Sequence, residues 1–111
     1  MDSNPNEIDK HVCSVQDVLA GKWKIVILAE LNGGVKRFNE LQKALVGIRQ
    51  AYLTQQLREL EANGMIHREI YKEIPPKVEY SLTEIGMKFR PVLEAMFTFG
   101  AEYKKYFELK E

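Results

Sequence analysis

The sequence predicts a small α+β domain that is mostly helical, with one β-hairpin placed before its last helices. Two patterns support this fold class. Apolar residues recur at helical spacing in several segments between residues 14 and 62 and again after residue 83, whereas apolar and polar residues alternate between residues 66 and 82. The 111 residues suit one domain with a modest core, which a partner subunit often completes.

The composition is that of an ordinary soluble protein, with 45% hydrophobic and 29% charged residues. No apolar run approaches the roughly 20 residues that span a bilayer, and no signal peptide opens the chain, so we expect a cytoplasmic protein. The net charge is zero, which argues against nonspecific nucleic-acid binding. Residues 36–72 nevertheless contain seven basic and only four acidic residues, and both flanks are slightly acidic.

The chain is predicted to begin with a flexible arm over residues 1–12, followed by one folded domain over residues 13–107. Ser14 and Asp17 have the spacing of a helix N-cap and its acidic partner. The helix that they start is short, because Gly21 follows soon after.

The next segments predict an apolar helix and a short strand. Residues 22–31 form the helix, and Asn32 with two glycines ends it. Trp23 invites a ligand-stacking interpretation, but a tryptophan on an apolar helix is more often a core residue. Residues 35–38 are too few for a helix and are interpreted as a small strand.

A helix, a tight turn and a second helix follow. Asn39 is predicted to cap a helix of about two turns, with Gln42 three residues later. A glycine-containing turn at residues 46–48 leads to a helix from about Gln50 to Ala62, which Asn63 and Gly64 end. This order is typical of a helix-turn-helix.

The alternating residues 65–82 predict a β-hairpin with two prolines at its tip, where no ladder N–H is needed. Thr83 is predicted to cap the next helix, and Pro91 to break or restart it. The last helix then runs to about Phe107. A two-stranded ribbon directly after a helix-turn-helix forms a wing, so the predicted architecture is a winged helix-turn-helix with a C-terminal dimerisation helix.

The helix from Gln50 has an unusual polar side. Its leucines occupy one narrow sector, and Ala51, Thr54, Gln55 and Arg58 lie opposite them. Amides, guanidinium groups and small methyl groups are the side chains that contact base edges in the major groove of DNA. A plain solvated surface is the alternative, and the helical wheel alone favours neither interpretation.

The predicted wing favours DNA, because wing and helix together would straddle one phosphate backbone. Lysines near a hairpin tip also protect exposed strand edges, which is the alternative explanation for Lys72 and Lys77. The start of the preceding helix, after Lys36 and Arg37, suits a phosphate. The predicted DNA-contacting residues are Lys36, Arg37, Asn39, Arg49, Gln50, Ala51, Thr54, Gln55, Arg58, Lys72 and Lys77.

The last helix has two apolar sides, which suggest a dimer interface and contact with its own core rather than a ligand pocket. Helices at both ends of the domain are expected to contribute to the dimer. The predicted interface stripe on the last helix is Val92, Met96, Phe99, Tyr103 and Phe107.

Other functional classes find little support in the sequence. Two histidines, one cysteine and no glycine-rich phosphate loop argue against an enzyme, and no cofactor or metal is expected. His11 and Cys13 would supply only half of a metal site across a dimer. A winged-helix domain used only for protein interaction remains an alternative, although such domains often lack the basic residues found here.

Several blocks of the chain, in the same order, resemble the HxlR family of bacterial winged helix-turn-helix transcription regulators, relatives of the MarR group. These blocks are GKWKIVILAEL, KRFNELQKAL, LTQQLRELEANGMIHREIY and PPKVEYSLTEIG, with Cys13 before the first helix. The resemblance covers roughly Cys13 to Tyr103. It implies a homodimer that binds an operator with inverted half-sites, a recognition helix from Gln50, and a wing over residues 65–82.

Two residues depart from the family pattern. Arg49 stands where the family usually has a serine that caps the recognition helix, and loss of such a cap costs about 1 kcal/mol. Arg49 instead brings a cation to the end of the helix that enters the groove. Ala51 stands where Lys or Arg is common. The basic contact has therefore moved by two positions.

Cys13 is shared with family members that sense electrophiles or oxidants, so the resemblance implies a thiol switch. A thiol just before a helix N-terminus would be favoured as thiolate by the helix dipole, with His11 adding charge nearby. The alternatives are a small structural residue at a helix start, or control by a small ligand instead of by redox chemistry.

Overall fold

The computed structural model describes residues 5–110. Along these residues the elements follow one another as α1 (Pro5–Val18), α2 (Lys24–Leu31), β1 (Lys36–Arg37), α3 (Phe38–Ala44), α4 (Gln50–Ala62), β2 (Ile66–Tyr71), β3 (Lys77–Leu82), α5 (Glu84–Met87) and α6 (Arg90–Lys110). The mostly helical α+β fold class with one hairpin is confirmed.

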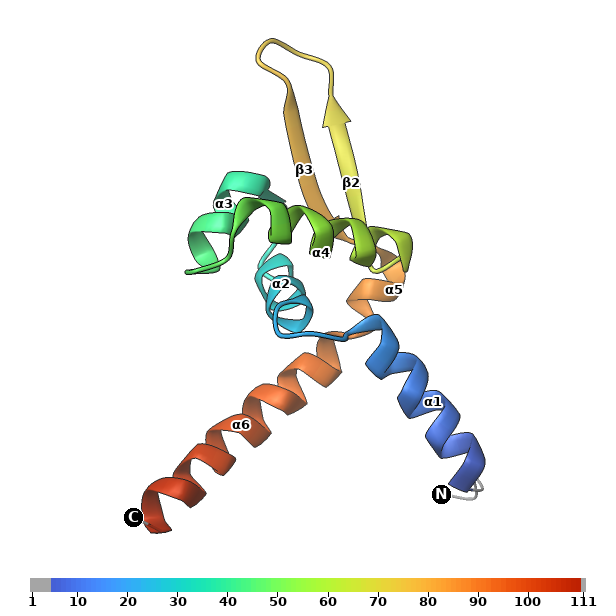
Figure 1. Cartoon of the computed structure of the whole chain (residues 1–111), viewed down its shortest axis with the longest axis vertical. Coiled ribbons are helices and arrows are strands. Elements are labelled where there is room, and N and C mark those ends of the chain that lie inside the picture. Colours follow the sequence, from blue (N-terminus) through green and yellow to red (C-terminus); the bar gives the residue numbers. More distant parts are fainter. Residues whose placement is uncertain (1–4, 111) are drawn as a thin grey trace.

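The elements form a central body from which three parts project (Figure 1). The β2–β3 hairpin projects on one side, and α1 and α6 diverge on the other side as two arms. The radius of gyration is 16.5 Å. A compact domain of this length would have a radius of gyration of about 13 Å. The arms are therefore not folded onto the body.

The core is built from leucine and isoleucine side chains of the central helices and the sheet. The strands pair antiparallel in the order β1-β3-β2, with Ile66 opposite Leu82 and Lys36 opposite Tyr80. The apolar residues that are at most 2% exposed come from α2, α3 and the residue after it, α4 and the start of β2; they are Ile27, Leu28, Leu31, Leu41, Leu45, Leu53, Leu57, Leu60 and Ile66. Trp23 is half-buried and packs against this core, as predicted.

The turn from α4 into the wing is joined to α5 by a compact set of hydrogen bonds. Gly64 has a positive φ of 77°, which ends α4 as the sequence predicted. The Thr83 hydroxyl donates to the carbonyl of Gly64 at 2.5 Å and accepts from the Gly86 amide at 3.1 Å. The predicted cap at Thr83 is thus confirmed, and it ties both ends of the hairpin together.

Three predictions near helix starts are wrong. Ser14 lies inside α1, where its hydroxyl donates to the carbonyl of Lys10, so it is not an N-cap. The predicted flexible arm is helical from Pro5 onward, while residues 1–4 lie outside the described residues. Asn39 is inside α3, which begins at Phe38 with Arg37 as its N-cap. Pro91, in contrast, lies in the first turn of α6 and restarts the helix as predicted.

We predict that Gly86→Ala destabilises the protein by roughly 1–3 kcal/mol, since a side chain there forces neighbouring backbone to move. A Cβ at Gly86 would overlap the carbonyl oxygen of Met65. Urea unfolding at fixed protein concentration measures the change. Gly33→Ala is the matched control, because its Cβ would meet only an ordinary contact at 3.4 Å. Equal midpoints for the two variants would contradict the prediction.

Candidate nucleic-acid interface

The polar side of α4 is exposed along its N-terminal half. Gln50, Ala51, Gln55 and Arg58 are all exposed, and Thr54 is half-buried with its hydroxyl donating to the carbonyl of Gln50 at 2.9 Å. The three leucines on the opposite side are at most 2% exposed. The structure therefore separates the two sides of this helix as the helical wheel indicated.

The first turn of α4 has no side-chain cap. Arg49 occupies the N-cap position in an extended conformation, with φ −81° and ψ 147°, and makes no side-chain capping hydrogen bond. No acidic residue lies in the first turn. The free N–H groups and the exposed Arg49 together make this end of the helix electropositive.

A network that the sequence did not suggest connects α4 to α2. The Nζ atom of Lys24 lies 2.6 Å from Oε2 of Glu59, and only 6% of the Lys24 side chain is exposed. The other carboxylate oxygen, Oε1, accepts a hydrogen bond from Nε2 of Gln55 at 3.2 Å. The Lys24 ammonium and then the Gln55 amide lower the pKa of the Glu59 carboxyl below its ordinary value.

A second pair connects α4 to the wing. Nε of Arg68, on β2, lies 3.3 Å from Oε1 of Glu61 near the end of α4. Next to this pair is a polar hollow of about 150 Å³, whose lining includes Thr54, Arg58 and Tyr80. Burial raises the pKa of the Tyr80 hydroxyl. Arg68 was not among the predicted site residues, although it connects the hairpin to α4.

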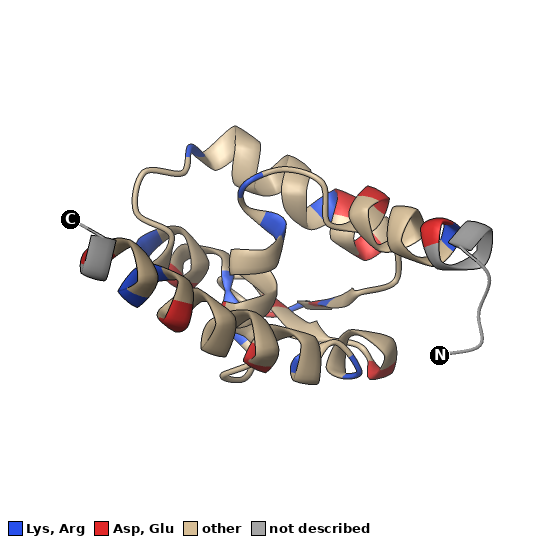
Figure 2. Cartoon of the chain, turned by 90° about the horizontal axis from the view of Figure 1, so that it is seen from below, with Lys and Arg blue, Asp and Glu red and all other residues tan. Residues whose placement is uncertain are grey.

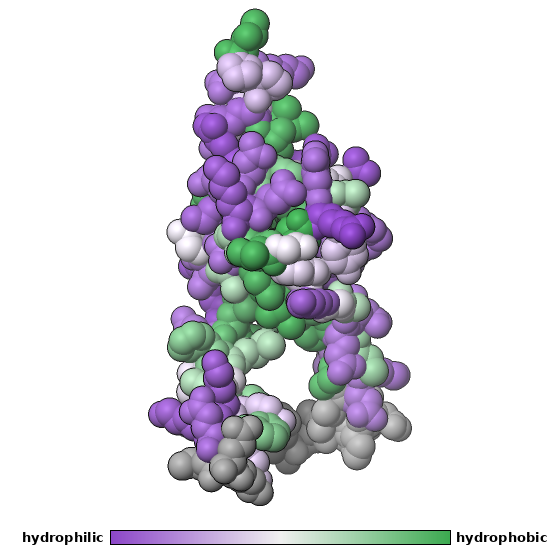
Figure 3. All heavy atoms as spheres, turned by 60° about the vertical axis from the view of Figure 1, so that its left-hand side comes forward, coloured by the Kyte–Doolittle hydropathy of each residue, from purple (hydrophilic) through white to green (hydrophobic). Residues whose placement is uncertain are grey.

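The two lysines of the wing differ in their surroundings. Lys77 lies 4.5 Å from the ring centroid of Tyr71 and about 4 Å from the carboxylates of Glu73 (3.9 Å) and Glu79 (4.0 Å). Lys72 is exposed. Lys72 is therefore better placed than Lys77 to meet an external anion. The apolar tip of the hairpin, visible in Figure 3, includes the fully exposed Ile74.

The remaining predicted contacts lie at the start of α3. Arg37 is exposed and its backbone N–H donates to Oε1 of Glu40 at 3.0 Å, while Lys36 is half-buried and Asn39 exposed. Figure 1 shows α3 beside the N-terminal end of α4, with the hairpin rising from the other end. Basic and acidic residues are interspersed along the ribbon in Figure 2.

The predicted dimer stripe is exposed on α6. Its five side chains are between 43% and 66% exposed; they are Val92, Met96, Phe99, Tyr103 and Phe107. Tyr103 stacks on Phe99 and makes an edge contact with Phe107. On the other arm Val12 and Val15 are each 49% exposed. Figure 3 shows apolar side chains among the polar ones on both lower arms.

Cys13 is exposed on α1, in the second half of a helix that begins at Pro5. The sequence argument that placed this thiol just before a helix N-terminus is therefore wrong. Among the side chains that the structure describes, residues 9–108, no group of three or more His, Cys, Asp or Glu could hold a metal ion. None of the helices described within residues 5–110 combines the length and the hydropathy of a membrane span.

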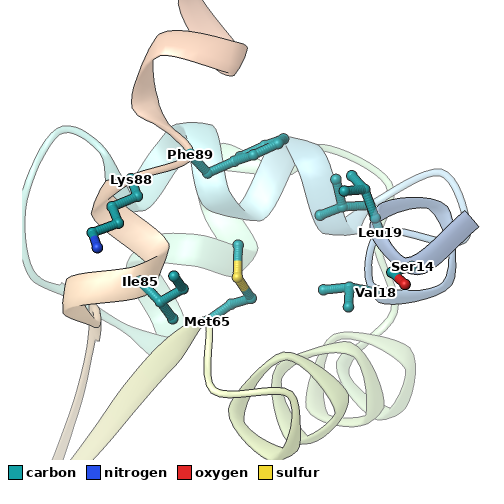
Figure 4. A pocket seen from close by; sticks show the side chains of 8 residues that line it. Ser14, Val18, Leu19, Met65, Ile85, Lys88 and Phe89 are labelled. Atoms are coloured by element: carbon teal, nitrogen blue, oxygen red, sulfur yellow. The ribbon is translucent and has the colours of Figure 1, made fainter. Parts of the chain in front are cut away.

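An apolar hollow of about 320 Å³ lies where α1 meets the body (Figure 4). Val18 and Leu19 at the end of α1 line one side, and Met65, Ile85 and Phe89 line the rest. The ammonium group of Lys88 points away from the other labelled side chains. A second apolar hollow, lined by Val12, Val15 and Phe89 among others, adjoins it along α1.

Comparison with known proteins identifies close relatives. The family model for the HxlR-like helix-turn-helix matches residues 18–108. The HTH-type transcriptional regulators YdeP and YybR of Bacillus subtilis are 54% and 45% identical to this chain, over alignments that cover 79% and 90% of it and 69% and 82% of their own lengths.

Solved structures agree with the sequence relatives. The redox regulator HypR in its reduced form is 45% identical, with a TM-score of 0.83 over 87% of this chain and 96% of its own. The reduced form of the transcriptional regulator YodB from B. subtilis is 33% identical, with a TM-score of 0.72 over 81% of this chain and 88% of its own.

We predict that the contribution of Glu59 to stability decreases as the pH falls. Because the folded-state pKa is lowered from an ordinary value of 4.5, the contribution is complete above that pH and is lost as the pH falls through the lowered value. The difference in unfolding free energy between wild type and Glu59→Gln should therefore shrink on acidification. Urea unfolding at several pH values measures this, with Glu61→Gln as the control. A difference independent of pH would contradict the prediction.

Proposed function

The chain belongs to the HxlR-like helix-turn-helix family, and from this premise we propose that it is a dimeric, sequence-specific DNA-binding regulator of transcription. The single observation that carries the proposal is the acid-free, exposed N-terminal half of α4 beside a projecting wing. The family and the similar proteins are transcription regulators rather than enzymes. A regulator of this kind acts in the cytoplasm, where prokaryotic DNA lies.

The proposed mode of binding places α4 in the major groove. Gln50 and Gln55 present amides, Arg49 and Arg58 present guanidinium groups, and Ala51 presents a methyl group, which are chemistries that match base edges. The hairpin then lies along the flanking backbone, where Lys72 and, to a smaller extent, Lys77 neutralise phosphate. The start of α3, with Lys36, Arg37 and Asn39, meets backbone phosphate on the other side of the groove.

Dimerisation through the two arms is the second part of the proposal. The chain exposes 8535 Å². A compact monomer of its mass would expose roughly 6,300 Å². The excess of one chain is larger than the roughly 800 Å² that each partner buries in a standard interface, so it leaves room for an extensive homodimer contact. Apolar residues such as Phe99 and Val15 are exposed on both arms. Helices α1 and α6 from two subunits, related by a two-fold axis, would present two α4 helices to inverted half-sites.

A winged-helix module for protein interaction is the competing interpretation. The exposed Arg49, Arg58 and Lys72, together with the absence of acids from the first turn of α4, favour DNA over such a module.

Control by thiol modification at Cys13 is proposed as the signal input. Cys13 is exposed, and two similar regulators have been solved under different redox conditions: HypR in its reduced and oxidised forms, and YodB in its reduced form and after diamide treatment. With one cysteine per chain, a disulfide has to join two subunits or capture a small thiol. Such a bond on an arm would change how the two α4 helices are spaced.

A small apolar ligand is the second candidate for the signal. The hollow in Figure 4 supports it, because it lies between α1 and the body and is lined mainly by apolar side chains. A ligand there would alter the angle between arm and body without any chemistry at Cys13.

We predict that Arg49→Ser stabilises the fold and weakens DNA binding. Serine supplies the missing N-cap, which should add about 1 kcal/mol to the unfolding free energy, while the cation at the groove-facing end is lost. Mobility shift on fragments selected from genomic DNA measures affinity, and urea unfolding measures stability.

Arg49→Ala separates the two effects, since it removes the charge without restoring a cap. It should weaken DNA binding as much as the serine variant does but give no gain in stability. Lower stability with unchanged DNA affinity in the serine variant would show that Arg49 is structural. Wild-type protein that selects no DNA sequence would contradict the proposed function.

We predict that Phe99→Asp converts the dimer to a monomer, because a carboxylate replaces an apolar contact in the middle of the interface stripe. Sedimentation equilibrium measures the mass. Ile74→Asp changes an equally apolar but fully exposed residue at the wing tip and should leave the dimer intact. A monomeric wild type, or dissociation of both variants, would contradict the proposed dimer interface.

We predict that diamide changes the DNA affinity of wild type and not of Cys13→Ser, because the single thiol is the only site for a disulfide. Mobility shift before and after oxidation, with nonreducing gels alongside, measures the effect. Full affinity of oxidised wild type, or an equal response of the serine variant, would assign the signal to a ligand instead.

A further inference from the structure

The Glu59 carboxylate joins two side chains of different elements through different oxygen atoms. Oε2 lies 2.6 Å from Nζ of Lys24 on α2, and Oε1 accepts from Nε2 of Gln55, one turn earlier on α4. Lys24 is buried, with 6% of its side chain exposed, while Glu59 is 40% exposed. The bridge therefore runs from the protein interior to the exposed polar side of α4.

Stability alone is a weak reason for a charged residue at position 24. A buried ammonium group loses its hydration, and a well-packed apolar side chain in its place is often as stabilising or more so. Lys24 is the first residue of α2 and is buried together with the apolar Ile27, Leu28 and Leu31 of the same helix. What the ammonium group provides in addition is a fixed counter-charge for Glu59.

The bridge also determines how Gln55 is oriented. An amide that donates from Nε2 to a carboxylate cannot be flipped, because its own Oε1 would then face the carboxylate oxygen. Oε1 and the second N–H of Gln55 are thereby left for an external partner. An acceptor and a donor side by side form the pair that matches N6 and N7 of adenine in the major groove.

Charge compensation matters at the same place. Glu59 is on the helix that is proposed to enter the groove, where an uncompensated carboxylate would repel phosphate. Lys24 lies against that carboxylate from the interior, so the charge is balanced without using the DNA-facing surface.

We propose that Glu59, held and neutralised by the buried Lys24, is a positioning residue that orients the Gln55 amide for recognition of one base pair, an inference that rests on the proposed DNA-binding function. Neither Lys24 nor Glu59 touches the base. Both act through Gln55, so their substitution should alter base preference at the position that Gln55 contacts.

The experiment compares base preference, measured by selection of bound sequences and by mobility shift on single-base variants of the best site. Gln55→Ala and Glu59→Ala should relax preference at the same base pair, by roughly 5- to 100-fold in discrimination. The double variant should be no worse than Gln55→Ala alone, because the two residues form one unit. Glu61→Ala is the matched control and should keep the preference, since Glu61 pairs with Arg68 instead.

A second arm tests the role of Lys24. Lys24→Met leaves the Glu59 charge uncompensated and should lower affinity for all sequences. Adding Glu59→Gln removes that charge and keeps an acceptor for the Gln55 amide, so the double variant should recover both affinity and preference. Recovery of this kind is not expected if Lys24 only fills space in the core. Circular dichroism of each variant confirms that it is folded.

Additive effects of Gln55→Ala and Glu59→Ala, or a uniform loss of affinity in Glu59→Ala without a change in preference, would overturn the proposal. If wild type prefers certain sequences and Glu59→Ala keeps the same preference, the positioning role of Glu59 is refuted and the proposed function still stands. Wild type without any sequence preference would instead contradict the proposed function. If Lys24→Met does not fold, the comparison of Gln55→Ala with Glu59→Ala still decides.

Discussion

The burial of one narrow stripe of leucines on α4 determines which of its side chains can meet a partner. Leu53, Leu57 and Leu60 are at most 2% exposed, and exposing any of them would cost about 1.5–3 kcal/mol. Each residue of a helix is turned by about 100° about the helix axis relative to the residue before it. Rotating α4 by one residue position would therefore expose leucine side chains and bury Gln55. The packing of the core thus fixes the direction of the polar side, and recognition chemistry depends on that rotation.

Local signals in the sequence were sufficient for most of the fold. The hairpin, the glycine that ends α4 and the cap at Thr83 depend on residues that are neighbours in the chain, and each was predicted. The start of α1 was missed because its first turn is rich in polar residues, although Ile8, Val12 and Val15 have helical spacing. Pro5 at the first helical position was the signal that could have indicated it. Ser14 has the right spacing for a cap, but a capping pattern cannot distinguish a helix start from a helix interior.

The candidate site was predicted only in part, for a related reason. The helical wheel correctly separated the exposed side of α4 from the buried one. The pairs Lys24–Glu59 and Glu61–Arg68 join residues of different elements, and no sequence period connects them. A lysine at the start of an apolar helix was the one sign of the first pair in the sequence. Lys77 is the converse case. Its residue type alone predicted a phosphate contact, and only the three-dimensional structure shows that carboxylates and the ring of Tyr71 already lie beside it.

The same packing limits how a signal on the arms can act on DNA. Helix α4 is joined to α2 by the Lys24–Glu59 pair and to the wing by the Glu61–Arg68 pair, and Thr83 joins the wing to α5. The body and the wing are therefore one connected unit. Cys13 lies on α1, and the apolar hollow lies where α1 meets that unit. A thiol adduct or a ligand there would not contact the side chains of α4 that are proposed to meet bases. In the proposed dimer, the response that remains is a change in the distance and angle between the two units, which would weaken binding to two half-sites more than binding to one.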